Sequence, residues 1–162
     1  MPPSLHLAGA PTPPTTIASQ FSAYVRIHSA ALDNTTFYSG PIVVESALGA
    51  VRKILTDYSL DPPAADDFLL RCDEGKEYYT PTDAGDCELL PPPRGECPIT
   101  EPGLPYIPPD ALYLRSERAN GVDCDVWEFY HPIYEGSVDA WVSRKGSALV
   151  RFVGARVVTD YL

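Results

Sequence analysis

The chain has 162 residues and a net charge of −10, from 22 acidic and 12 basic side chains. This length predicts a single domain with a sizeable core. The acidic balance argues against binding to a nucleic-acid backbone or to an anionic membrane surface. No run approaches the roughly 20 apolar residues of a transmembrane helix.

Residues 1–19 are rich in Pro, Thr and Ala. We expect them to form a flexible leader, followed by one domain over residues 20–162. Gln20–Ser29 then alternates cleanly between apolar and polar side chains, which predicts a half-buried antiparallel strand. His28 falls on the polar side of this strand, where we expect it to be solvated.

Several further strands are expected before the proline-rich middle of the chain. Gly40-Pro41 is expected to interrupt the first of them, and an acidic-Gly turn joins a hairpin. One segment, Ser46–Leu55, contains good helix formers and could instead be a short helix, although the neighbouring β-branched residues favour a strand. The expected strands are Thr36–Ser46, Ala50–Tyr58, Phe68–Asp73, Lys76–Thr80 and Cys87–Leu90, with a loop over Asp61–Asp67.

The C-terminal part reads as a β-meander. A proline-rich connection over Pro91–Pro109 precedes it, and Ala111–Arg118 is compatible with either a short helix or a strand. Three β-branched and aromatic runs follow, and the last residues could close the sheet. The runs are Val122–Tyr130, Val138–Ser143 and Ala148–Val153, with Ala155–Leu162 after them. The total is eight to ten strands with little helix.

Both faces of this meander carry apolar side chains. Trp127 and Phe129 point to the side opposite Cys124 and Val126, because side chains alternate along a strand. The second run places Trp141 opposite Val138, Ala140 and Val142, and the third places Ala148, Val150 and Phe152 opposite Leu149, Arg151 and Val153. Such a sheet needs a cover on both faces, supplied by another protein layer or by an apolar ligand around which the sheet curves.

Four cysteines lie in the second half, at separations unlike the CxxC pairs of zinc sites. They are Cys72, Cys87, Cys97 and Cys124. An even count without metal spacing favours two disulfides and an oxidising compartment, and the alternative is four buried free thiols in a cytosolic protein. Asn34 opens a glycosylation sequon in an expected turn. No signal peptide is visible, so a secreted protein would be represented here by a mature fragment or a piece of a longer chain.

Catalytic constellations are not apparent, and we expect a non-enzymatic protein without a cofactor. The histidines His6, His28 and His131 have no partner at a spacing typical of a triad or a metal site. Asp123 and Asp125 could bind calcium with Asp73, Glu74 or Asp110, but without a calcium-loop motif solvated carboxylates are the favoured interpretation, and no metal site is predicted.

Aromatic side chains offer the stronger functional signal. Rings supply a large apolar wall at little entropic cost, so they could line the concave face of a curved sheet, and the alternative is that they are core beneath a covering layer. The candidates for a ligand-binding wall are Trp127, Phe129, Trp141, Phe68 and Tyr79. Arg151, Arg26 or Arg52 could contact a head-group carboxylate or phosphate.

The order of elements resembles the family of curved antiparallel half-barrels that includes the bacterial lipoprotein carrier LolA and the eukaryotic ependymin-related proteins. The resemblance rests on an early hairpin around YSGPIVVESALGAVRKIL and the pair FLLRCDEGKEYYTPTDAGDCELL. A proline-rich link ending YIPPDAL follows, then CDVWEFY and DAWVSRKGSALVRF. It implies a strongly curved antiparallel sheet over about residues 20–162, with an apolar pocket for lipids.

The resemblance also implies a secreted or lysosomal protein with disulfides, glycosylation, calcium binding and a possible homodimer. The chain lacks the family's cysteines near both ends and any lipidation cysteine. Our hypothesis is a non-enzymatic protein that binds a lipid or fatty acyl chain, each buried CH₂ group contributing roughly 0.8 kcal/mol. The alternative is a secreted acidic interaction module that binds calcium or a protein partner and has no ligand cavity. An enzyme of unrecognised type is a weaker third interpretation.

Overall fold

The computed structural model describes residues 9, 11–14, 20–31, 35–45, 49–71, 74–81, 85–90, 107–131, 135–145 and 148–162. Within these ranges the chain forms eleven strands and no helix. The strands are β1 (Gln20–Ser29), β2 (Thr36–Glu45), β3 (Ala50–Asp57), β4 (Ala64–Arg71), β5 (Lys76–Pro81), β6 (Glu88–Leu90), β7 (Leu112–Ala119), β8 (Val122–His131), β9 (Gly136–Ser143), β10 (Leu149–Gly154) and β11 (Val157–Tyr161).

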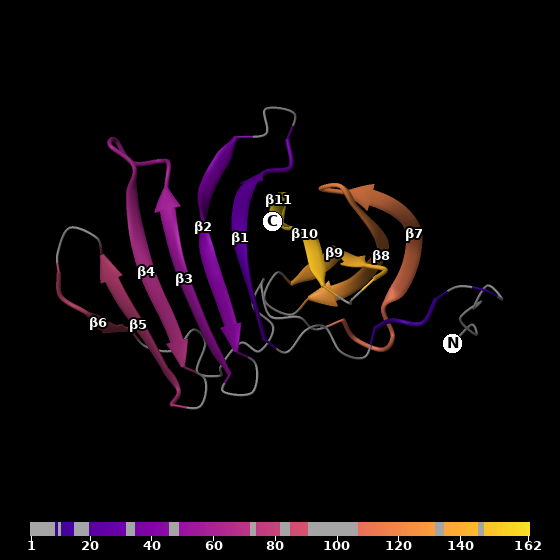
Figure 1. Ribbon diagram of the computed structural model, residues 1–162, viewed down its shortest axis with the longest axis horizontal. Helices are drawn as coiled ribbons and strands as arrows, with labels where there is room; N and C mark the ends of the chain where they lie inside the picture. The colour runs from indigo at the N-terminus through magenta and orange to yellow at the C-terminus, as the bar shows by residue number, and fades with distance from the viewer. Residues whose placement is uncertain are drawn as a thin grey trace.

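All eleven strands belong to one antiparallel sheet, in the order β6-β5-β4-β3-β2-β1-β11-β10-β9-β8-β7. Each half is a meander, and the halves join where β1 pairs with β11. In Figure 1, β1–β6 form an open fan, whereas β7–β11 curl at the other end of the sheet. The sheet is strongly curved and is not closed into a barrel, which confirms the expected fold class.

One face of the sheet is apolar along nearly its whole width. We call it the apolar face, and it is defined by a cluster of buried residues that includes Trp127. Their side chains cover strands β1–β4 and β8–β11 and include one residue from the segment before β7. The residues are Val25, Ile42, Val44, Val51, Leu70, Ile107, Trp127, Phe129, Val138, Ala140, Val142, Phe152 and Tyr161.

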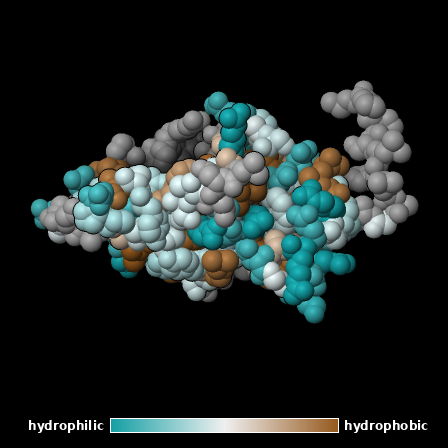
Figure 2. Space-filling model, turned by 90° about the horizontal axis from the view of Figure 1, so that it is seen from above, coloured by the Kyte–Doolittle hydropathy of each residue, from teal (hydrophilic) through white to brown (hydrophobic). Residues whose placement is uncertain are grey.

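The opposite side, here called the second face, has a smaller buried cluster confined to β7–β10. It consists of Ala119, Cys124, Val126, Trp141 and Val150. On β1–β3 the second face is open instead, as Tyr24 and Val43 are 48% and 51% exposed. Figure 2 shows hydrophobic side chains in separate groups among hydrophilic ones when the molecule is seen from above.

The strand predictions are largely confirmed. Ala50–Asp57 is a strand, as favoured over the helix alternative, and Leu112–Ala119 takes the strand of the two structures expected for that segment. Three details are corrected: β2 continues through Gly40-Pro41, and β4 begins at Ala64, inside the expected loop. The strands number eleven in the described ranges, above the expected eight to ten. β2 and β4 are each stabilised by pairing with both neighbouring strands, which local propensity does not reveal.

The expected alternation of the third meander strand is wrong. A bulge between Leu149 and Arg151 shifts its register against β9. Phe152 therefore packs with Leu149 in the apolar cluster, while Val150 joins the second cluster. A bulge inserts one extra residue into a strand and so re-aims the side chains after it.

No helix long and apolar enough to cross a membrane occurs in the ranges given above.

Candidate functional site

The structure separates the aromatic wall candidates between the two faces. Trp127 and Phe129 are 2% and 8% exposed in the apolar cluster. Phe68 and Tyr79 share that face, since they lie in one cross-strand row with Lys53 and Ile42. Four of the five candidates therefore line the same side of the sheet. The fifth, Trp141, and the head-group candidate Arg151 lie on the second face, opposite each other in the β9–β10 register.

The apolar face is closed at one end and half-open at the other. Around Trp127 it is fully buried, and the Tyr113 ring packs edge-on against it with a centroid distance of 5.5 Å. Towards β5 the Phe68 and Tyr79 rings are only half-buried, and they stack with centroids 4.9 Å apart. The Tyr79 hydroxyl donates to Asp66 at 3.1 Å. This end offers an apolar surface with a polar group at its margin.

Trp141 is fixed by polar contacts on the second face. Its indole N–H donates to Glu117 at 2.5 Å, and the Arg115 and Arg151 guanidinium groups lie 5.8 and 5.9 Å from the ring centroid. The hydrogen bond from Arg115, followed by that from Trp141, holds the pKa of Glu117 below its usual value. The ring and the N–H of Trp141 are thus both engaged by charged side chains on the second face.

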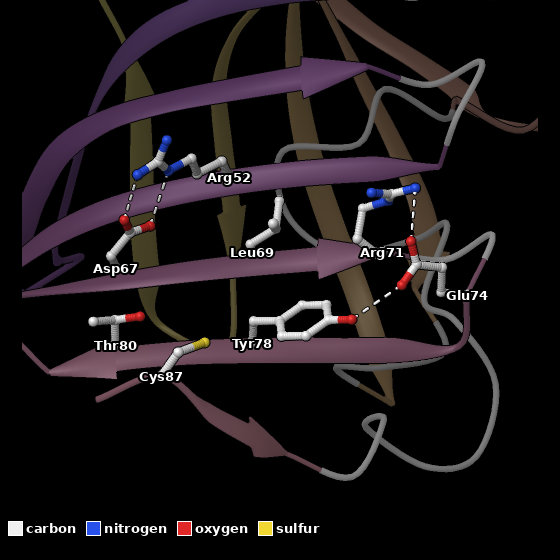
Figure 3. A pocket seen from close by; sticks show the side chains of 8 residues that line it. All are labelled: Arg52, Asp67, Leu69, Arg71, Glu74, Tyr78, Thr80 and Cys87. Atoms are coloured by element: carbon white, nitrogen blue, oxygen red, sulfur yellow. Dashed lines mark hydrogen bonds and ion pairs between the residues drawn. The ribbon is translucent and has the colours of Figure 1, made fainter. Parts of the chain in front are cut away.

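A pocket with a volume of 420 Å³ opens on the second face over β3–β5. Figure 3 shows two polar groups at its ends with Leu69 between them. Arg52 holds Asp67 at one end through bonds of 3.1 and 2.5 Å. The remaining lining residues are Arg71, Glu74, Tyr78, Thr80 and Cys87, with Arg71 2.9 Å from Glu74 and the Tyr78 hydroxyl donating to Glu74 at 3.0 Å.

Charges in this pocket already neutralise one another. The hydrogen bond to Asp67 raises the pKa of Arg52, and the hydrogen bond to Glu74 raises the pKa of Tyr78. A long apolar chain bound in this pocket would bury little apolar protein surface besides the Leu69 side chain. Arg52 also lies on the face opposite Phe68 and Tyr79, so it is not positioned to bind the head group of a ligand lying on the apolar face.

His28 is buried, which corrects the expectation of a solvated side chain. It is 6% exposed, and its Nε2 lies 2.9 Å from the Asp160 carboxylate on the neighbouring strand β11. Asn120 Nδ2 and Arg151 Nε donate to the other oxygen of Asp160 at 2.9 and 2.6 Å. We call these four residues the Asp160 clasp. The alternation of β1 marks His28 as polar, but it cannot show that a charged partner, Asp160, is buried diagonally across from it on β11.

The clasp ties the tip of the β7–β8 hairpin to β11. Asn120 lies in the turn at φ 48°, next to Gly121 at φ 79°, the left-handed pair typical of a two-residue hairpin. Burial alone would raise the pKa of Asp160, but the hydrogen bonds from Arg151, Asn120 and His28 hold it below its usual value. The Asn-Gly pair is a strong hairpin signal that would have identified this turn from the sequence, although not its partner.

Two cysteines depart from the expected disulfides, since Cys87 and Cys124 are free. They lie near opposite ends of the sheet, next to β6 and in β8, too far apart to be bridged to each other. Cys124 is fully buried beside Val126 and acts as a small apolar side chain, and burial raises the pKa of its thiol. Cys72 and Cys97 lie outside the described residues, as do Asn34 and most of the expected leader.

Asp125 does not point to a calcium site. Ser116 donates a hydrogen bond to it at 2.7 Å, and Arg144 lies 3.6 Å away. Within the described ranges, no group of three or more His, Cys, Asp or Glu side chains could hold a metal ion. Asp73, a possible calcium ligand in the interpretation that the sequence did not favour, lies outside these ranges.

No protein-family model and no curated protein sequence matches the chain. Among solved structures, LprF from Mycobacterium bovis is 12% identical over 88% of this chain and 84% of its own, with a TM-score of 0.43. The Mycobacterium tuberculosis lipoprotein LppX is 14% identical over 88% of this chain and 85% of its own, with a TM-score of 0.36. Likenesses at this level carry no functional inference.

Proposed function

We propose that this protein binds a hydrophobic ligand, a lipid or fatty acyl chain, on the apolar face of its curved sheet and catalyses no reaction. One observation carries the proposal: the apolar face is continuous across the sheet but becomes half-open at Phe68 and Tyr79. A sheet normally buries such a face beneath a second layer. In the described part of the chain this single sheet is the only regular layer.

The binding energy would come from burial. Each CH₂ group removed from water contributes roughly 0.8 kcal/mol, so a long acyl chain needs few specific polar contacts. Phe68 and Tyr79 would provide the wall at the open end, and Trp127 and Phe129 the closed end of the same face. The Tyr79 hydroxyl and Asp66 lie where the polar end of such a ligand would meet solvent.

We further propose a location in the secretory or lysosomal lumen or outside the cell, which rests on the resemblance to the LolA and ependymin-related half-barrels. Glycosylation at Asn34 rests on its sequon, and one domain over residues 20–162 rests on the chain length. The alternative function, an interaction module without a ligand cavity, becomes the better interpretation if no lipid binds.

Native mass spectrometry with organic extraction of the same sample tests the proposal. We expect an adduct of lipid mass on the purified protein, or one formed after incubation with fatty acids and phospholipids. Phe68→Asp should abolish the adduct, because it places a charge on the half-open apolar surface. Val43→Asp is the matched control, as Val43 is 51% exposed on the second face and its replacement should leave the adduct intact.

Thermal unfolding of both variants separates loss of binding from loss of folding, and Phe68→Leu, which keeps the surface apolar, should bind like the wild type. An unliganded mass that persists through every incubation would exclude the proposal, as would equal adducts on Phe68→Asp and the wild type.

A further inference from the structure

Strand β7 ends the sheet, and no strand in the described ranges pairs with its outer edge. It has eight residues, whereas β6 at the opposite end has three. In an antiparallel sheet, alternate residues of an edge strand point their backbone N–H and C=O groups outward. An exposed edge of this length favours pairing with another chain.

Side-chain contacts hold this edge in place from both faces. On the second face, Glu117 accepts the Trp141 N–H, and Asn120 at the end of β7 is bound to Asp160. On the apolar face, the Ser116 hydroxyl lies 2.7 Å from the Asp125 carboxylate and 2.8 Å from the Tyr113 hydroxyl. A strand already fixed in its bound conformation loses little entropy on pairing.

The sequence of β7 is charge-complementary to itself in antiparallel alignment. A two-fold axis at Ser116, perpendicular to the sheet, places Arg115 of each copy opposite Glu117 of the other. Arg115 and Glu117 already form a 2.7 Å ion pair within the chain, so two copies would form a network of four alternating charges. Opposite charges directly across an antiparallel pair are stabilising, and like charges are destabilising.

The neighbouring two-fold registers are disfavoured by the same rule. An axis at Arg115 would place that residue opposite itself, and an axis at Glu117 would place two carboxylates opposite each other. We propose that the protein forms a homodimer through antiparallel β7–β7 pairing centred on Ser116, which joins two curved sheets into one. The proposal rests on the β7 edge alone and is independent of the lipid-binding function.

Disulfide trapping tests the register. Ser116 of one copy would face Ser116 of the other with Cβ atoms about 4.5–5.5 Å apart, so a small shift of the two strands brings them to the roughly 3.5–4.5 Å of a disulfide. Arg118 is also exposed and lies on the same face, but the two copies of Arg118 would be offset by about 14 Å along the strands. Ser116→Cys should therefore give a covalent dimer under oxidising conditions, and Arg118→Cys should stay monomeric.

Both variants are made in a Cys87→Ser background, because Cys87 is an exposed thiol, and peptide mapping locates the crosslink. Sedimentation velocity of the wild-type chain at physiological ionic strength, which screens the charge of −10 on each copy, should show a concentration-dependent dimer. A wild-type monomer at every concentration would overturn the proposal. So would a dimer in which Ser116→Cys fails to crosslink, or in which Arg118→Cys crosslinks equally.

Discussion

The two halves of the sheet differ in how many of their faces are buried. In β1–β3 one face is buried and the other is open, as the alternating burial along Thr36–Glu45 shows. In β8–β11 residues on both faces are buried, and Val157–Tyr161 has four buried residues in succession. The difference arises from the β7–β8 hairpin, whose tip reaches β11 and covers the second face of the strands between. A single sheet can thus bury both of its faces where it curls back on itself.

The largest effect is expected in the open half, where β2 and β3 approach closely. A Cβ atom on Gly40 would lie 1.8 Å from the carbonyl oxygen of Ile54. Gly40→Ala should therefore reduce the free energy of unfolding by at least about 3 kcal/mol or prevent folding, because backbone has to move. Urea unfolding followed by circular dichroism measures this loss.

Gly121→Ala is the matched control for that substitution. A Cβ atom there would meet nothing within 4 Å, although φ is +79°. Only left-handed backbone strain is expected, about 1–2 kcal/mol. Equal losses in the two variants would show that contact with Ile54 does not matter, and would weaken the view that the open half depends on close strand approach.

The second-largest effect is expected in the C-terminal half of the sheet, where the Asp160 clasp holds the tip of the β7–β8 hairpin on β11. Asp160→Asn removes the buried carboxylate that binds His28, Asn120 and Arg151, and should cost about 2–4 kcal/mol, because their donors lose a charged acceptor. Hydrogen exchange should accelerate in β7–β9 and stay unchanged in β2–β4. Asp67→Asn removes the ion pair between Asp67 and Arg52. It should have little measurable effect, because the Arg52 side chain is exposed to solvent.

The clasp also predicts a pH dependence. Asp160 has a folded-state pKa below its unfolded value of about 4. Its contribution to stability is therefore fully present above the unfolded pKa and is lost as the pH falls through the folded pKa. The unfolding free energy of the wild type should decline more steeply below about pH 4 than that of Asp160→Asn. Parallel pH profiles would mean that Asp160 is not the group responsible.

The same contrast explains how much the sequence could predict. Strand β1 was predicted with its exact bounds, because an alternation of period two is a local signal. The clasp was missed because His28 and Asp160 are 132 residues apart and meet only where the first and last strands pair. Alternation placed Trp127 and Trp141 correctly within their own strands, but not on opposite faces of the sheet, because that depends on the register between β8 and β9. The contacts of Trp141 with Arg115 and Glu117 likewise join strands distant in the sequence, which no local pattern encodes.

The smallest effect is expected for a carboxylate in the C-terminal half of the sheet that lies across from another carboxylate. Asp139 in β9 lies directly across from Glu128 in β8. Burial, followed by repulsion from Glu128, raises the pKa of Asp139. Its ionisation therefore opposes folding increasingly as the pH rises from the unfolded pKa through the folded pKa.

Asp139→Asn should consequently stabilise the protein at neutral pH by up to about 1 kcal/mol, the range for a like-charge pair directly across a sheet. The gain should disappear below the unfolded pKa, where the wild-type carboxyl is protonated in both states. Chemical unfolding at neutral and acidic pH measures both values, with Asp67→Asn as the control that removes a carboxylate bound to Arg52 and should give no gain. A loss of stability at neutral pH in Asp139→Asn would mean that this carboxylate stabilises the curled strands β7–β11, as Asp160 does.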